Sequence, residues 1–306
     1  MNKDMITTHV GKTSRHVGIN PTWQAMPMGV VFVFFFLTPL ALILMVSFWN
    51  FNEYELLPDF TLRNYASMFE GCSSRNEYGD LCVTLATYLS TFKFTLITWA
   101  VTLVLGFSMA YFLAFHVQST AMQTLLFALC TVPFWTSNVI RMISWIPLLG
   151  RNGWVNQTLQ SIGLTTQPME WLLFSEFSVV LAFVHLYTMF MIVPIFNSMM
   201  RIDRSLIEAA QDAGASAWQI LWHIIVPLSR TGIVIGSIFI LTIVVGDFVT
   251  VGVMGGQQIA SVGKMIQVQT SYLQFPLAAA NAVVLLLIVL IMVSSLMRIT
   301  DIRKEL

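Results

Sequence analysis

Six long apolar stretches alternate with more polar ones along the chain, and each apolar stretch is long enough to cross a lipid bilayer. A membrane-spanning helix needs about 20 predominantly apolar residues. The stretches lie at residues 28–49, 92–115, 121–145, 177–200, 231–253 and 277–298. Pro133, Asn138 and Arg141 interrupt the third, which is therefore the least regular. The pattern predicts an all-α, polytopic membrane protein with about six transmembrane helices.

The distribution of charge orients these helices, because cytoplasmic loops carry an excess of lysine and arginine. With six spans, the basic residues of the leader, the central loop and the tail all fall on one side: Lys3, Lys12, Arg15, Arg201, Arg204, Arg230, Arg298, Arg303 and Lys304. Acidic residues fall on the other side: Glu53, Glu55, Asp59, Glu70, Glu77, Asp80, Glu170 and Glu176. We expect a cytoplasmic leader (1–27), one transmembrane domain (28–298) and a cytoplasmic tail (299–306).

The composition supports a membrane protein and argues against several other classes. The chain is 57% hydrophobic and only 10% charged, whereas soluble domains are about 25% charged. Its net charge is zero, so no basic surface indicates nucleic acid as a partner. The five histidines show no spacing typical of a metal site. The first apolar stretch is long and lacks a small-residue cleavage site, so we expect an uncleaved span.

The three cysteines divide into two groups. Cys130 lies in an apolar stretch, where we expect it to pack without reacting. Cys72 and Cys82 lie in a polar loop predicted to be external, where a disulfide is chemically possible. The loop position allows this bridge without requiring it, so both forms stay open.

The central loop, residues 201–230, predicts a short exposed helix. Ser205 and Glu208 have the spacing of a capping box, which would start the helix near Leu206. Gly214 should end it, because glycine adopts a left-handed C-terminal cap without steric cost. Small residues recur on one face with helical spacing and would let another backbone come close: Leu206, Ala209, Ala210 and Ala213.

A second short helix is predicted directly afterwards. Ser216 and Gln219 repeat the spacing of a capping box. Pro227 should end or kink this helix, because proline lacks a backbone N–H and clashes with the preceding turn.

The same loop resembles the EAA loop of ABC importer permeases. Its fixed positions are Glu208-Ala209-Ala210, Gly214, Ile224 and Pro227, with Val226 where the family has leucine. The alternative is an ordinary amphipathic connector between two spans. The resemblance implies a type I importer permease fold, in which this loop docks on a separate ATP-binding subunit. It assigns coupling to Glu208, Ala209, Ala210, Asp212 and Gly214.

The resemblance also implies partners and a location. The ATP-binding cassette subunits would form a dimer and hold ATP and Mg²⁺, so this chain would be non-catalytic and carry no cofactor or metal of its own. A second permease subunit, a paralogue of this chain, and a periplasmic or extracellular solute-binding protein would complete the importer. The chain would lie among the lipids of the bacterial cytoplasmic membrane, with both termini in the cytoplasm.

Ionisable residues inside spans are costly and are therefore candidates for function. Asp247 lies late in the fifth stretch and Arg141 in the third. Asp247 either faces the transported solute or is held by hydroxyl groups or an arginine of a neighbouring helix. Arg141 is expected to extend to the outer interface. His185 is expected to be a hydrogen-bonded core residue rather than a ligand.

A narrower resemblance concerns the spermidine/putrescine permeases. It rests on Pro133-Phe134-Trp135-Thr136-Ser137, Arg141, Trp145 and Leu149-Gly150, and on Gly246-Asp247-Phe248-Val249-Thr250 with Gly255-Gly256. Val251 stands where that family often has proline. The resemblance implies polyamines as the solute, with other small solutes such as opines or amino acids as the alternative.

A cationic solute is physically compatible with the residues of these segments. An amine needs counter-charge or aromatic faces on its path, and cation–π contacts are worth about 0.5–2 kcal/mol. Five residues are candidates for this substrate path: Asp247, Trp135, Trp145, Tyr187 and Phe248. A pore must release its cargo, so most specificity would lie in the external binding protein.

Two other classes of function are less compatible with the sequence. An intramembrane enzyme would need several acids or histidines in facing spans, whereas Asp247, His185 and Arg141 are isolated. A secondary transporter would show discontinuous spans in matching halves.

The predicted topology can be tested by labelling introduced cysteines from either side of the membrane. Cysteines at positions 12 and 303 should react only from the cytoplasm, and one at position 75 only from outside. An external C-terminus would mean an odd number of spans, and would place the central loop on the side away from ATP.

Overall fold

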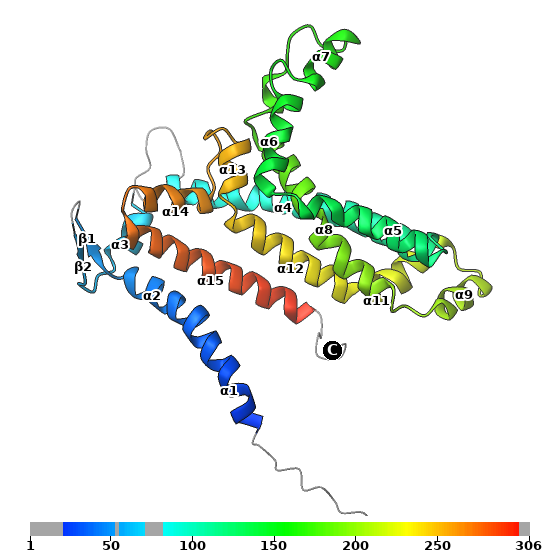
Figure 1. The fold of residues 1–306 in the computed structure, drawn as a ribbon, viewed down its shortest axis with the longest axis horizontal. Coiled ribbons are helices and arrows are strands. Elements are labelled where there is room, and N and C mark those ends of the chain that lie inside the picture. The colour runs from blue at the N-terminus through cyan, green and yellow to red at the C-terminus, as the bar shows by residue number, and fades with distance from the viewer. Residues whose placement is uncertain (1–20, 53–54, 71–81, 300–306) are drawn as a thin grey trace, which may run out of the picture.

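The computed structural model describes residues 21–52, 55–70 and 82–299, and most of these residues are helical (Figure 1). Four helical segments are long and apolar enough to cross a membrane: Met26–Val46, Val83–His116, Glu170–Met199 and Phe275–Arg298. Two further candidates are bent, Thr120–Trp135 with Asn138–Ser161 by 89° and Ala217–Leu228 with Arg230–Gly246 by 66°. Counting each bent pair as one span gives up to six. The predicted all-α membrane fold is confirmed.

Three helices form the centre of the bundle: α4 (Val83–Tyr111), α8 (Glu176–Met199) and α12 (Arg230–Gly246). Glycines let them approach closely. A Cβ atom at Gly232 would lie 2.4 Å from the Pro194 carbonyl oxygen, and one at Gly106 would lie 2.8 Å from Cγ of Met191. Small residues serve this purpose in membranes, where apolar burial does not drive helices together.

Polar side chains also hold α4 against its neighbours. Buried threonines follow one side of the helix: Thr87, Thr91, Thr95, Thr98 and Thr102. The Val262 N–H donates to Thr91 Oγ1 at 3.0 Å, and Trp99 Nε1 donates to Ser237 Oγ at 2.8 Å. These bonds join α4 to the start of α14 (Val262–Ser271) and to α12.

The first span diverges from the bundle (Figure 1). It consists of α1 (Pro21–Phe32), a π-helical turn (Val33–Leu37) and α2 (Thr38–Val46), and α2 contacts α15 (Phe275–Ile299). A short hairpin of β1 (Asn50–Phe51) and β2 (Leu56–Leu57) and the helix α3 (Arg63–Met68) follow. The buried Asn64 amide donates to the carbonyls of Ser47 and Trp49, which fixes α3 to the end of the span.

The third span is not the single helix predicted at 121–145. Its elements are α5 (Thr120–Thr131), a 3₁₀ turn (Val132–Trp135), α6 (Asn138–Leu149) and α7 (Trp154–Ser161). Pro133 stands in the 3₁₀ turn, and Thr136 and Ser137 adopt extended ψ angles of 150° and 135°, so the helix cannot continue. Beyond this break α6 and α7 project sideways from the bundle (Figure 1).

The predicted fifth span, 231–253, also ends early. The helix α12 stops at Gly246, Asp247 is extended with ψ 110°, and α13 (Val249–Met254) begins after Phe248. The second helix of the central loop continues from α10 (Ala217–Ile220) through a π-helical turn (Leu221–Ile225) to α11 (Val226–Leu228). Pro227 lies just before the 66° bend, as predicted.

Two cysteines lie among the described residues. Cys82 is disulfide-bonded and Cys130 is free. Cys72, the predicted alternative partner of Cys82, lies outside the described residues.

The close approach of α8 and α12 can be tested at Gly232. Gly232→Ala should lower the thermal stability of the detergent-solubilised protein, because overpacking a tight contact costs about 1–3 kcal/mol. Gly29→Ala is the matched control, since a Cβ atom there meets no atom within 4 Å. Equal melting temperatures for the two variants would contradict the packing described.

Candidate functional site

The break between α12 and α13 places the Asp247 carboxylate against α8. The Tyr187 hydroxyl donates to Asp247 Oδ2 at 2.5 Å, and the Thr250 hydroxyl donates to the same oxygen at 2.6 Å. The Thr250 N–H donates to Asp247 Oδ1 at 2.9 Å. The carboxylate therefore satisfies a donor in the first turn of α13 and joins that turn to α8. Asp247 was predicted either to face the solute or to be held by hydroxyl groups or an arginine of a neighbouring helix. The structure shows contacts with the hydroxyl groups of Tyr187 and Thr250.

Arg141 does not extend to the outer interface, and that expectation was wrong. Its side chain is buried, with 7% of its surface exposed. Its Nη2 donates to Asn138 Oδ1 at 2.5 Å, and its buried Nε meets no acceptor among the described residues. Neither Asp247 nor Arg141 forms an ion pair with a described residue. The helix α6 packs against α8 and α13, which covers the guanidinium with protein.

The predicted aromatic residues do not form one cluster. Trp145 Nε1 donates to His185 Nδ1 at 3.0 Å, so this nitrogen of His185 is an acceptor. His185 is thus hydrogen-bonded as expected, but it is exposed rather than in the core. Trp135 is 85% exposed and lines an apolar groove with Phe134, Phe190 and Phe239. Phe248 is half-exposed and lies next to Asp247 in the chain.

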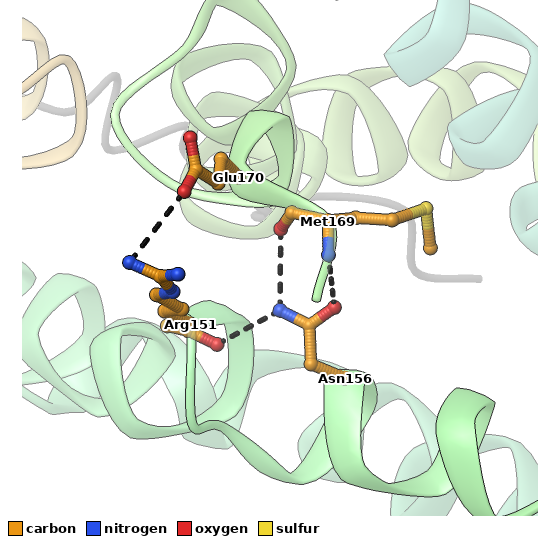
Figure 2. Close-up of polar contacts among 5 residues, drawn as sticks. Arg151, Asn156, Met169 and Glu170 are labelled. Carbon is orange, nitrogen blue, oxygen red and sulfur yellow. Dashed lines mark hydrogen bonds and ion pairs between the residues drawn. The ribbon is translucent and has the colours of Figure 1, made fainter. Parts of the chain in front are cut away.

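Polar contacts fold the segment after α6 into a defined arm, residues 150–173 (Figure 2). The amide of the buried Asn156 donates to the Gly150 and Met169 carbonyls at 3.0 and 3.2 Å, and it accepts from the Met169 N–H at 2.8 Å. Arg151 and Glu170 form an exposed ion pair at 3.7 Å. One buried asparagine therefore joins both ends of the arm.

At the other end of the bundle, the first helix of the central loop is α9 (Arg204–Asp212). The predicted capping box of Ser205 and Glu208 was wrong. Asp203 is the N-cap, and its side chain accepts from the Ser205 N–H at 3.0 Å. Hydrogen bonds from the backbone and the side chain of Ser205 hold the pKa of the Asp203 carboxyl below its usual value. Ile202 is buried where the chain leaves α8.

The predicted end of this helix and the second capping box are confirmed. Gly214 has φ +82°, and the N–H groups of Gly214 and Ala215 donate to the carbonyls of Gln211 and Ala210 at 2.8 and 2.9 Å. This is the Schellman pattern of a helix C-terminus. Ser216 and Gln219 exchange the hydrogen bonds of a capping box at the start of α10.

The exposure of α9 separates its residues into two groups. Ile207 and Ala210 pack against the core of the bundle. Leu206, Ala209 and Asp212 are exposed. Glu208 lines a groove of about 390 Å³ with Tyr111, Phe115 and His116 from the C-terminal end of the second span. Ala210 therefore faces the bundle, while Ala209 and Asp212 remain available to a partner.

Comparison with known proteins identifies the family. Residues 103–303 match the model of the binding-protein-dependent transport system inner membrane component family. The chain belongs to this family. The resemblance of the central loop to that of ABC importer permeases is thus confirmed, and the chain is an inner membrane component with several membrane-spanning helices.

Relatives agree with this assignment. The chain is 29% identical over 258 residues to the spermidine/putrescine transport system permease protein PotB of Haemophilus influenzae, covering 81% of this chain and 84% of the relative. It is 31% identical over 230 residues to PotB of Salmonella typhimurium, covering 75% of each. A bacterial alginate ABC transporter chain, solved in complex with a periplasmic protein, has the same fold with a TM-score of 0.69 at 16% identity, over 90% of this chain and 93% of that one.

The assignment of Asp203 as the N-cap of α9 can be tested by backbone hydrogen exchange. Asp203→Ala should speed exchange in the first turn of α9 by about tenfold at most, because a lost N-cap weakens that turn. Glu208→Ala, the matched control, should leave this exchange unchanged, since Glu208 caps no described N–H group.

The same cap should depend on pH. Because the pKa of Asp203 is lower in the folded state, its contribution is present above the ordinary carboxyl pKa and is lost as the pH falls through the folded value. A first turn equally protected in Asp203→Ala and the parent chain would contradict the assignment.

Proposed function

We propose that this chain is one of two permease subunits of an ATP-driven importer that moves polyamines into the cytoplasm. The similarity to two PotB proteins over most of the chain supports this solute class. The chain itself would be non-catalytic, because ATP and Mg²⁺ would be bound by a separate pair of ATPase subunits. A paralogous permease and an external solute-binding protein would complete the assembly.

The observation that carries the proposal is the state of the Asp247 carboxylate. It is half-buried and forms no ion pair with a described residue. A carboxylate offers about four acceptor positions, and donors from Tyr187 and Thr250 occupy three of them. One position and the full negative charge therefore stay available to a cationic solute. A buried acid that served only to hold helices together would gain more from a basic partner.

Aromatic groups near this carboxylate would complete the path. The Tyr187 ring holds Asp247 through its hydroxyl, and Phe248, the next residue in the chain, has a half-exposed ring. An amine over such a face gains about 0.5–2 kcal/mol. Trp135 lines a separate apolar groove, and Trp145 is engaged with His185. We therefore assign the inner part of the path to Tyr187, Asp247 and Phe248, and keep Trp135 and Trp145 as contacts farther along it.

The central loop would transmit the movement of the ATPase. Ala209 and Asp212 are exposed on α9, Glu208 lines the adjoining groove, and Gly214 ends the helix abruptly. Ala210 would act from the inner face, where its small size lets α9 lie close to the bundle. The 66° bend between α11 and α12 connects this loop to the centre of the bundle. In this assembly the loop and both termini would face the cytoplasm.

Asp247→Asn tests the proposed role, because it keeps the shape and acceptor capacity of the side chain and removes the charge. Uptake of labelled spermidine by the reconstituted importer should fall at least tenfold. The upper bound is set by a Coulomb energy of about 4 kcal/mol at ~4 Å and an effective dielectric of 20. Assembly and basal ATPase activity should stay close to those of the parent importer.

Thr250→Val is the matched control for this test. It removes a hydrogen bond to Asp247 and leaves the charge in place, so it should reduce uptake less. Undiminished spermidine uptake in Asp247→Asn would refute the counter-charge role, and a parent importer that does not transport spermidine would refute the solute class.

A further inference from the structure

Two positively charged side chains come from helices that pack on α13, and neither is paired with an acid among the described residues. Arg141 lies on α6 and Lys264 on α14, and both helices contact α13. Arg141 is buried and Lys264 is half-buried. A cation that loses its hydration in this way is costly unless an opposite charge compensates it. Asp247, just before α13, is also without an ion pair, so three charges of mixed sign adjoin this short helix.

Each cation is bonded to a neutral amide of its own helix. Arg141 Nη2 donates to Asn138 Oδ1, and Lys264 Nζ donates to Gln267 Oε1 at 2.8 Å. Each amide stands three residues from its cation, and residues at this spacing are neighbours on a helix surface. An amide oxygen accepts a hydrogen bond but carries no negative charge, so both positive charges stay uncompensated by their direct partners.

Arg141 is placed within electrostatic range of the Asp247 site. Its side chain is 7% exposed, where α6 meets α8 and α13. One turn further along α6, Trp145 is bonded to His185 of α8, and Tyr187 follows His185 by two residues. The side chains of Arg141 and Tyr187 interact electrostatically, and the Tyr187 hydroxyl is bonded directly to Asp247. Tyr187 therefore contacts the carboxylate and lies within range of the guanidinium.

Lys264 reaches the same region from α14. A Cβ atom on Gly252 of α13 would lie 3.4 Å from Lys264 Nζ, so the ammonium group lies against the backbone of α13. The preceding residue, Gly263, is also close. A Cβ atom there would lie 2.7 Å from the Gly246 carbonyl oxygen and 3.4 Å from the Phe248 nitrogen. The start of α14 therefore packs directly on the linker between α12 and α13.

We propose that Arg141 and Lys264 are the counter-charges of Asp247, held away from it by their amide partners, and that they limit how strongly the site attracts a cation. This inference rests on the proposed function, because it concerns the carboxylate assigned to the solute. A direct ion pair would occupy Asp247. Counter-charges at a distance compensate its charge inside the membrane and leave its free acceptor position open.

The same arrangement favours release of the solute. A cation bound at Asp247 meets two like charges nearby, and this repulsion falls only slowly with distance inside a protein. Its binding is therefore weaker than at an isolated carboxylate in the same surroundings. Weak binding suits a transport path, because the cargo must leave it again.

The test measures the electrostatic potential beside Asp247 with Phe248→Cys, since this position is half-exposed. Two methanethiosulfonate reagents of similar size are compared, one carrying a trimethylammonium group and the other a sulfonate group. Their reaction rates are measured on the assembled importer in detergent, with full-length chains that carry Cys130→Ala, and labelling is read from the mass of this chain. The ratio of the two rates cancels a change in exposure and keeps the effect of charge.

Arg141→Gln and Lys264→Gln should each raise the cation-to-anion rate ratio about fivefold, as one partly screened charge at ~10 Å would give. Asp247→Asn should lower the ratio. Arg141→Lys keeps the charge and should keep the parent ratio. Arg151→Gln is the matched control, because it removes an exposed arginine of the arm, and it should leave the ratio unchanged.

An unchanged ratio in Arg141→Gln or Lys264→Gln would overturn the proposal, and so would an equal rise in Arg151→Gln. A rise in Arg141→Lys as large as in Arg141→Gln would show that Arg141 acts through packing rather than charge, which also overturns it. Lys264 is only half-buried, so Lys264→Gln keeps the test decisive where Arg141→Gln does not assemble.

The test separates this inference from the proposed solute. The labelling uses no solute, so its outcome is independent of whether the importer transports spermidine. A parent importer that shows the expected ratios without spermidine uptake would refute the solute class alone. Phe248→Cys that reacts with neither reagent would contradict the open path beside Asp247, and would overturn both the path and its counter-charges.

Discussion

The requirement that every polar group inside a membrane find a partner shapes this structure. Two of its spans are broken, and the structure compensates for each break. After α12, the Asp247 carboxylate accepts the Thr250 N–H at the start of α13 and is itself held by Tyr187. After α5, Arg141 and Asn138 bond to one another in the first turn of α6, covered by α8 and α13, and only Arg141 Nε of this pair lacks a partner among the described residues. A broken helix thus brings charged groups into the membrane domain.

The helix α8 links these features. It packs along both α4 and α12, and carries the hydroxyl groups of Ser178 and Tyr187 that hold the two ends of α13. Its first turn is closed by a capping box of Ser175 and Ser178. Close contacts at Gly232 and Gly106 leave little room for α8 to shift against its neighbours. Movement is therefore expected in the short helices at its ends rather than in α8 itself.

The two candidate regions lie at opposite ends of this bundle. The central loop is joined to α12 through a 66° bend, and α13 follows α12 directly. A displacement of α9 would reach Asp247 through α12, without any need for contact between the two regions. This arrangement suits the proposed importer, whose energy source and solute-binding partner would act on opposite faces of the membrane.

The sequence by itself determined the membrane class, the approximate spans and the cap at Ser216, because hydropathy and local capping depend on neighbouring residues. Gly214 was likewise predictable, since only its own backbone is involved. Only the tertiary structure decided the partners of Asp247, which lie 60 residues away at Tyr187 and nearby at Thr250. It also showed Asp203 rather than Ser205 as the cap, directly after the buried Ile202. The mean hydropathy of a segment depends only on its own residues, so the sequence predicts it. The breaks in the helices and the long-range hydrogen bonds depend on which helices pack together.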